Sequence, residues 1–197
     1  MHEIFKIAAQ FHIAPMVLGA DSNILAPDQG LDTVVIETRT NMNQAQRLED
    51  GTITAQCGMT MARLATIAME HGYTGLEFAH GIPGTVGGGV YMNAGAYGGE
   101  MPQVGTNGTA MDRKGHVLEL PAEELRLSYR HSRFMEEDLV ILSATVRLQK
   151  GEREEIRAKM AELMTRRRTS QPLEYPSAGS TFKRPVGGYA AALIEAS

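Results

Sequence analysis

Residues 81–99 read GIPGTVGGGVYMNAGAYGG, a stretch in which glycine dominates. Glycine inside a helix or strand costs roughly 0.5–1 kcal/mol relative to alanine, so this composition needs a reason. Close approach of the backbone to a ligand is one reason, and a helix over Thr85–Asn93 would direct its N-terminus toward an anion. A purely structural glycine-rich loop is the alternative. The stretch lacks the Gly-Lys pair of a P-loop and the strand–turn–helix context of a dinucleotide-binding unit.

A second glycine-containing turn, Gly19-Ala20-Asp21-Ser22-Asn23, precedes this stretch. It lies between two expected strands, Met16–Leu18 and Ile24–Ala26. A tight turn there exposes consecutive backbone N–H groups, and its serine and asparagine add side-chain donors, which suits a phosphate. An ordinary turn is the alternative. Asp21 brings a negative charge near such a ligand, which is unfavourable unless its side chain points away.

The periodicity of apolar residues predicts a mixture of helices and strands. Helices are expected over residues 2–13, Thr60–Glu70 and 152–168, with a short one beginning near Tyr189. Strands are expected over residues 52–56, Thr33–Ile36, Val117–Leu120, Leu127–Tyr129 and Leu139–Leu148, with a hairpin turn at residues 112–115. A further candidate strand is interrupted by Gly105, Asn107 and Gly108. This order favours an α+β fold over a doubly wound sheet.

Composition limits the classes of function. The chain has 197 residues, of which 43% are hydrophobic, and a net charge of −4. We therefore expect a globular protein with no nucleic-acid partner and, because no apolar run is long enough to span a bilayer, no membrane partner. The single cysteine, Cys57, is expected in the core, which fits a reducing, cytoplasmic location. The histidines lack metal-ligand spacing, so no metal site is expected, and the sequence leaves the oligomeric state open.

Two further segments carry side chains suited to catalysis. Arg130 follows Tyr129, and an arginine can bind a carboxylate through two hydrogen bonds, although an ordinary surface arginine is the alternative. Residues 171–185 are polar and contain several prolines. Small residues at Ala178 and Gly179 leave room there for a substrate beside Ser180.

These motifs, and the order in which they follow one another along the chain, resemble those of the UDP-N-acetylenolpyruvoylglucosamine reductases. The matching segments are Leu18-Gly19 with Ser22–Leu25, Leu76–Phe78 with Gly81–Gly88, and Met92–Gly98. The Tyr-Pro-Ser-Ala-Gly-Ser segment at 175–180 is similar to the serine motif of the family's shorter subclass. The resemblance implies a vanillyl-alcohol-oxidase-type FAD-binding domain and an incomplete α+β substrate domain. It assigns FAD binding to Gly19, Ser22, Asn23, Gly81, Ile82, Gly84, Thr85, Gly87, Gly88, Asn93, Ala94, Gly95 and Ala96.

The resemblance also implies a reaction. In this family NADPH supplies a hydride, which FAD passes to C3 of the enolpyruvyl group of a UDP-sugar, giving UDP-N-acetylmuramate for peptidoglycan synthesis. Arg130 matches the family's active-site arginine, which can stabilise the negative charge that develops, and Ser180 matches the serine that protonates C2. The resemblance places substrate binding at Tyr129, Arg168 and Lys183.

The same resemblance implies an organisation in three parts. Residues 1–40 would be the remainder of a first FAD-binding subdomain, residues 41–150 a second, and residues 151–197 a linking helix with the start of a substrate domain. A full member has an additional N-terminal segment and continues past residue 197, so we expect a chain truncated at both ends, without the family's C-terminal glutamate. The alternatives are a non-catalytic remnant that retains part of a flavin or nucleotide-sugar surface, and another oxidase of the same FAD superfamily, which the serine motif disfavours.

Overall fold

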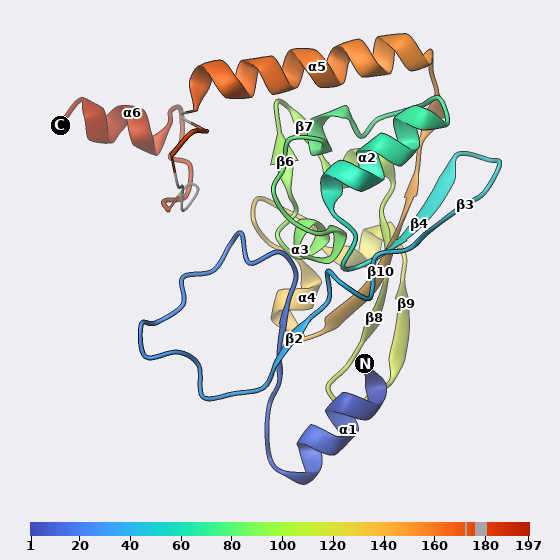
Figure 1. The fold of residues 1–197 in the computed structure, drawn as a ribbon, viewed down its shortest axis with the longest axis vertical. Helices are drawn as coiled ribbons and strands as arrows, with labels where there is room; N and C mark the ends of the chain where they lie inside the picture. Colours follow the sequence, from blue (N-terminus) through green and yellow to red (C-terminus); the bar gives the residue numbers. More distant parts are fainter. Residues whose placement is uncertain (172, 176–180) are drawn as a thin grey trace.

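The fold is built around a five-stranded antiparallel sheet. The computed structural model describes residues 1–171, 173–175 and 181–197. The strand order is β3-β4-β10-β8-β9, and Figure 1 shows α2 (Met61–Glu70) and α3 (Val86–Tyr91) beside β4 and β10. The mixture of helices with an antiparallel sheet confirms the α+β class. The strands are β3 (Ala45–Arg47), β4 (Thr52–Gln56), β8 (Asn107–Met111), β9 (Val117–Leu120) and β10 (Val140–Arg147).

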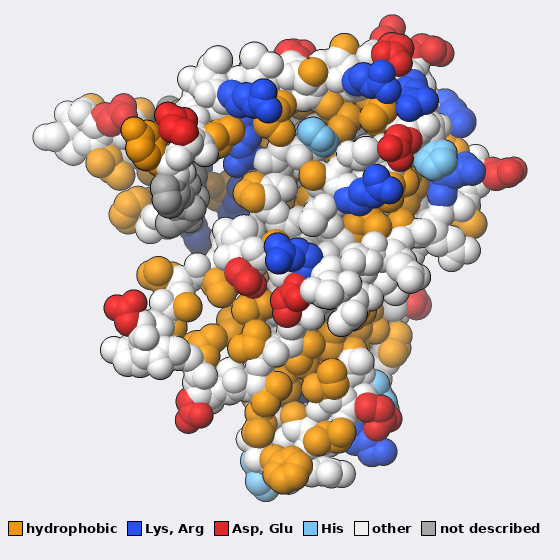
Figure 2. All heavy atoms as spheres, viewed as in Figure 1, with side chains coloured by type: hydrophobic (Ala, Val, Ile, Leu, Met, Phe, Trp, Pro, Cys, Tyr) orange, Lys and Arg blue, Asp and Glu red, His pale blue; other side chains and the backbone are white. Residues whose placement is uncertain are grey.

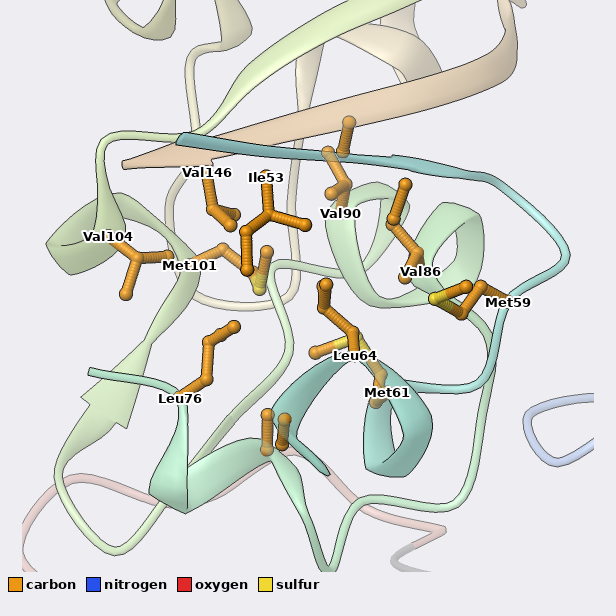
Figure 3. Close-up of a cluster of buried hydrophobic side chains, with 14 of the residues drawn as sticks. Ile53, Met59, Met61, Leu64, Leu76, Val86, Val90, Met101, Val104 and Val146 are labelled. Carbon is orange, nitrogen blue, oxygen red and sulfur yellow. The ribbon is translucent and has the colours of Figure 1, made fainter. Parts of the chain in front are cut away.

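The main core lies between this sheet and the two helices. Ile53 of β4, Val146 of β10, Leu64 of α2 and Val90 of α3 are fully buried and gather in one cluster in Figure 3. Burying an aliphatic side chain of this size contributes about 1.5–3 kcal/mol. The cluster therefore holds α3, and with it the glycine-rich stretch, against the sheet.

The long helix α5 (Arg153–Ser170) confirms the helix predicted over residues 152–168. It contacts α2 and the 3-10 helix η1 (Glu77–Ala79), and Figure 1 shows it lying across the side of the fold that carries α2. Ile156, Met160 and Leu163 are the buried residues of this helix. Their packing fixes the position of the arginines in its last turn.

The N-terminal segment forms a smaller unit. Helix α1 (His2–Gln10) leads into β1 (Met16–Leu18), which pairs in parallel with β2 (Val35–Glu37). The loop between the two strands extends away from the sheet (Figure 1). The predictions of a helix before Pro15 and of a strand at Met16–Leu18 are both confirmed.

Arg113 fastens this unit to the sheet. Its guanidinium donates a hydrogen bond to the Pro15 carbonyl at 2.9 Å. It also donates two to the Asp138 carboxylate, at 2.5 and 2.8 Å, and lies 5.3 Å from the centre of the Phe5 ring. A bidentate pair of this kind fixes geometry as well as contributing energy. Arg113 therefore sets where β1 and the following turn lie.

None of the helices in the described ranges combines the length and apolar character needed to cross a membrane.

The remaining elements are short. The short elements are β5 (Tyr73–Thr74), β6 (Gly95–Ala96), β7 (Gly99–Glu100), η2 (Met101–Val104), η3 (Ala122–Leu125), α4 (Arg133–Glu136), β11 (Gln149–Lys150) and α6 (Ala190–Glu195).

Three predictions about strands are wrong. Ile24–Ala26 is irregular and exposed, with Leu25 at 96%, and Pro27 beside it has no N–H group to donate to a ladder. Leu127–Tyr129 runs into a tight turn instead of a strand. Residues 107–111 form the continuous strand β8 although they include a glycine. A Cβ on Gly108 would lie 2.9 Å from the Phe134 ring, so packing explains the glycine at this position. The glycine leaves space for the Phe134 ring and does not interrupt the strand.

Candidate functional site

A cavity of about 1080 Å³ lies between the loop after β1, the glycine-rich stretch and the end of α5. In Figure 2 the surface is indented between the C-terminal segment and the loop 19–34. Most of the predicted cofactor residues line this cavity, although they come from two distant parts of the sequence. The predicted residues in its wall are Gly19, Ser22, Asn23, Ile82, Gly84, Thr85, Gly87, Gly88, Ala94, Gly95, Ala96 and Arg130.

The other predicted site residues lie elsewhere. Gly81, Asn93, Tyr129, Arg168 and Lys183 are outside the cavity wall. Ser180 lies outside the described residues. The roles of all these residues stay predictions.

The turn after β1 and the loop before α3 form one structure. The Ser22 hydroxyl donates a hydrogen bond to the Pro83 carbonyl at 2.8 Å. A Cβ on Gly19 would collide with the Thr85 side chain, so only glycine allows this approach. Asp21 has a φ of 57°, which aspartate tolerates better than most residues, and this explains an aspartate at this position of the turn.

These two segments expose a group of backbone donors. In the described part of the chain, the N–H groups of residues 20–23, Gly84 and Thr85 donate no hydrogen bond to the protein. Consecutive N–H groups in a turn form a concavity that binds anions. A diphosphate is a ligand that would satisfy several of them together.

The N-terminus of α3 does not contribute such donors, contrary to the expectation for a helix over Thr85–Asn93. The Val86 N–H is bonded to the Met59 carbonyl at 2.7 Å, and the Gly87 N–H to the Cys57 carbonyl at 2.8 Å. The Gly88 N–H is bonded to the Thr85 hydroxyl at 3.4 Å. The first two bonds attach α3 to the segment that follows β4, and the third caps the helix, so none of these three N–H groups is free for an anion.

The glycines of α3 serve two different purposes. A Cβ on Gly87 would lie 2.8 Å from the Cys57 Cβ, and one on Gly89 would lie 2.7 Å from the Met61 sulfur. These two glycines are therefore required by packing. Gly88 is exposed, and a Cβ there would approach only Thr85, at 3.6 Å. Gly88 is the one of the three that packing does not explain.

Alanine substitutions should separate these two purposes. Gly87→Ala should lower the free energy of unfolding by about 1–3 kcal/mol, because the added carbon overpacks the core. Gly88→Ala should leave it unchanged or raise it by up to about 1 kcal/mol, because alanine favours a helix. Urea unfolding of both variants measures the difference, and equal destabilisation would contradict this division.

Burial also affects the one cysteine. Loss of solvent around Cys57 raises the pKa of its thiol to about 11. The thiol is therefore neutral at physiological pH and unsuited to act as a nucleophile. This confirms the expectation that Cys57 belongs to the core.

Arg130 is held on the cavity wall by an unusual turn. Ser128 and His131 exchange two backbone hydrogen bonds of 3.1 Å, which places Arg130 at a φ of 55°. Its guanidinium donates to the Asn93 carbonyl at 3.2 Å and lies 5.4 Å from the Tyr129 ring centre. Such a conformation in a non-glycine residue costs of order 1–3 kcal/mol and is concentrated at functional sites.

The neighbour of Arg130 has a structural partner. His131 contacts the Glu136 carboxylate at 2.8 Å. This hydrogen bond, together with one from Arg126, lowers the pKa of Glu136. His131 thus has a structural contact within this segment.

Two arginines that the sequence did not single out line the cavity. Arg167 donates a hydrogen bond to the Gly81 carbonyl, and Arg166 lies 5.1 Å from the Tyr97 ring centre. Successive residues on a helix point about 100° apart, so Arg168 of the same turn is exposed and outside the wall. Three consecutive arginines at the end of a helix are the sequence feature that could have indicated a positively charged cavity wall. The rotation of the helix decides that Arg166 and Arg167 reach the cavity and Arg168 does not.

Comparisons with known proteins show which family this chain belongs to. Residues 1–121 match the family of FAD binding domains. The UDP-N-acetylenolpyruvoylglucosamine reductase of Clostridium novyi is 46% identical over 194 residues, which are 98% of this chain and 62% of that protein. The chain therefore spans about six-tenths of the length of the curated relatives it matches.

Solved structures give the same result. The UDP-N-acetylenolpyruvylglucosamine reductase from Thermus caldophilus matches with a TM-score of 0.81 and 32% identity, covering 100% of this chain and 70% of that one. An alkyldihydroxyacetonephosphate synthase matches with a TM-score of 0.55 and 16% identity, covering 76% of this chain and 32% of that one, which shows a shared fold alone. On its sequence and its structure together, the chain belongs to the FAD binding domain family and, within it, to the UDP-N-acetylenolpyruvoylglucosamine reductases.

Proposed function

We propose that this chain carries the FAD site and part of the substrate site of a reductase. Its reaction would be the NADPH-driven reduction of the enolpyruvyl group of UDP-N-acetylglucosamine enolpyruvate to UDP-N-acetylmuramate, a peptidoglycan precursor. The observation that carries the proposal is Arg130, held in a left-handed turn on the wall of a cavity whose backbone donors suit a diphosphate. The single, buried thiol supports a reducing, cytoplasmic setting.

The described residues fit FAD. Unbonded N–H groups of residues 20–23, Gly84 and Thr85 would hold its diphosphate. The exposed backbone at Gly88 and the wall residues 94–96 would lie along the rest of the molecule. Held there, FAD would supply the hydride-transfer chemistry that links NADPH to C3 of the enolpyruvyl group.

The side chains of this protein would handle charge and proton transfer. Arg130 would stabilise the negative charge that spreads from C2 into the substrate carboxylate. Ser180 would donate the proton to C2. Tyr129, Arg168 and Lys183 would contact the UDP-sugar. Arg166 and Arg167 would add positive charge to the wall of the same cavity.

Gly88→Ala tests the FAD site without disturbing the fold. Because the added methyl group points into open space on the cavity wall, it should displace a ligand that contacts this backbone. We expect FAD affinity to fall by roughly tenfold or more, since even small misfits at a close contact cost over 1 kcal/mol. Fluorescence titration with FAD measures this. Gly188→Ala is the matched control, because its Cβ meets nothing within 4 Å and the residue is outside the wall. Equal affinities in all three proteins would remove Gly88 from the site.

Stopped-flow spectroscopy of the gene product tests the reaction. NADPH alone should bleach the flavin, and the enolpyruvyl UDP-sugar should then restore its colour. Bleaching without restoration would contradict the proposed substrate. If neither bleaching nor restoration is observed, the chain is a non-catalytic remnant.

A further inference from the structure

Asn93 has a position that the FAD site does not explain. Its side chain is 3% exposed, it lies outside the cavity wall, and its φ is 41°. Asparagine is one of the few residues that occupy this left-handed region readily. The residue nevertheless contacts the turn that carries Arg130, which is 37 positions away in the sequence.

The contacts of Asn93 hold that turn in two ways. The Asn93 Nδ2 group donates a hydrogen bond to the Ser128 carbonyl at 3.0 Å. The Asn93 carbonyl accepts one from the Arg130 guanidinium at 3.2 Å. Ser128 is the first residue of the hairpin that places Arg130. Asn93 is thus hydrogen-bonded both to the backbone of the turn, at Ser128, and to the Arg130 side chain at its tip.

Glu100 fixes the orientation of the Asn93 amide. Its Oε2 atom accepts a second hydrogen bond from the Asn93 Nδ2 group, at 3.1 Å. The Asn93 Oδ1 atom is buried and has no hydrogen-bond partner in the described part of the chain. A rotated amide would direct this oxygen toward the carboxylate and the Ser128 carbonyl, both of which are acceptors. The side chain therefore has one favourable orientation, with both N–H groups used.

A second buried side chain anchors the other end of the turn. The Ser132 hydroxyl donates a hydrogen bond to the Tyr91 carbonyl at 2.7 Å, and Ser132 is fully buried. Residues 91–93 at the end of α3 thus hold residues 128–132 at both sides of Arg130. Because Val86 and Val90 of α3 belong to the main core, the arginine is tied to a well-packed element of the fold.

We infer that Asn93 is a positioning residue for Arg130 and not a ligand of the flavin. The inference rests on the proposed function for its catalytic consequence. It predicts that loss of the Asn93 side chain loosens the turn, and that it affects the reduction of the enolpyruvyl group only through Arg130. Flavin binding and flavin reduction by NADPH should stay close to those of the parent protein.

The first test is structural and does not depend on activity. In Asn93→Gly, the backbone can keep its left-handed φ while the amide is removed. The His131 N–H, which closes the hairpin, should exchange with solvent about tenfold faster, the equivalent of one lost hydrogen bond. Asn43→Gly is the matched control, because the Asn43 amide also donates to two backbone carbonyls, those of Arg39 and Thr40. It should leave the exchange of the His131 N–H unchanged.

A second variant removes the N–H donor while a side chain stays in place. Asn93→Asp keeps the shape of the side chain and tolerates a positive φ, but it offers no N–H group to the Ser128 carbonyl. It should also accelerate exchange at His131. Unchanged exchange in either folded variant would overturn the inference.

The second test is a double-mutant cycle with Arg130→Lys. In the parent background, Asn93→Gly should slow flavin reoxidation by the enolpyruvyl substrate by roughly tenfold, whereas in the Arg130→Lys background it should add less than about twofold. Full additivity would show that Asn93 acts independently of Arg130 and would overturn the inference. If the parent protein reduces no enolpyruvyl substrate, the proposed function fails, and exchange at His131 still decides whether Asn93 holds the turn.

Discussion

Ser180→Ala is expected to slow flavin reoxidation by the enolpyruvyl substrate by roughly 10²–10⁴-fold, the usual contribution of a positioned general acid. Reduction of the flavin by NADPH should be nearly unaffected, because no proton is delivered to C2 in that half-reaction. The expectation rests on the sequence around Ser180, where Ala178 and Gly179 leave room for the substrate. Stopped-flow measurement of each half-reaction separates the two effects.

Ser180→Cys provides the matched comparison. A thiol can still donate a proton, so this variant should retain more activity than Ser180→Ala. If the alanine variant reoxidises as fast as the parent, Ser180 is not the acid. If flavin reduction collapses as well, the role of Ser180 is structural.

Arg130→Lys should lower turnover by roughly 10²–10³-fold, as expected when a group that stabilises transition-state charge is lost. Lysine keeps the positive charge but lacks the planar fork that binds a carboxylate with two hydrogen bonds. It also lacks the guanidinium group that reaches the Asn93 carbonyl. Affinity for FAD should change far less than turnover, because the arginine is expected to act on the substrate.

The chain supplies a close control for this variant. Arg126 also has a positive φ, 49°, and pairs with the Glu136 carboxylate, but it lies outside the cavity wall. Arg126→Lys should therefore turn over substrate at nearly the parent rate. Equal turnover in Arg130→Lys and the parent would exclude Arg130 from the mechanism.

The sequence predicts the elements with strong periodicity and misses those set by tertiary contacts. Helices α1 and α2 and strands β4, β9 and β10 follow from their apolar patterns. Strand β3 (Ala45–Arg47) was not expected, because all its residues are exposed and show no alternation. It forms because β4 offers it an edge.

The glycine-rich site shows the same limit at the level of single residues. Its location could be predicted, since that much glycine is costly in regular structure. The sequence could not show which of these glycines is required by packing: Gly87 and Gly88 both line the cavity, yet only a Cβ on Gly87 would clash with Cys57. Likewise, Arg168 was predicted to bind substrate, but its neighbours Arg166 and Arg167 are the arginines of α5 that line the cavity. The position of Asn93 under the Arg130 turn depends on contacts between segments far apart in the chain.

Flavin content of the purified gene product is the most direct test of the central claim. The protein should be yellow, with near-stoichiometric FAD that is released by denaturation. If the protein is isolated without FAD, it should take up added FAD and lose that ability in part on Gly88→Ala. A colourless protein that binds no added FAD would contradict the claim that this cavity is a flavin site.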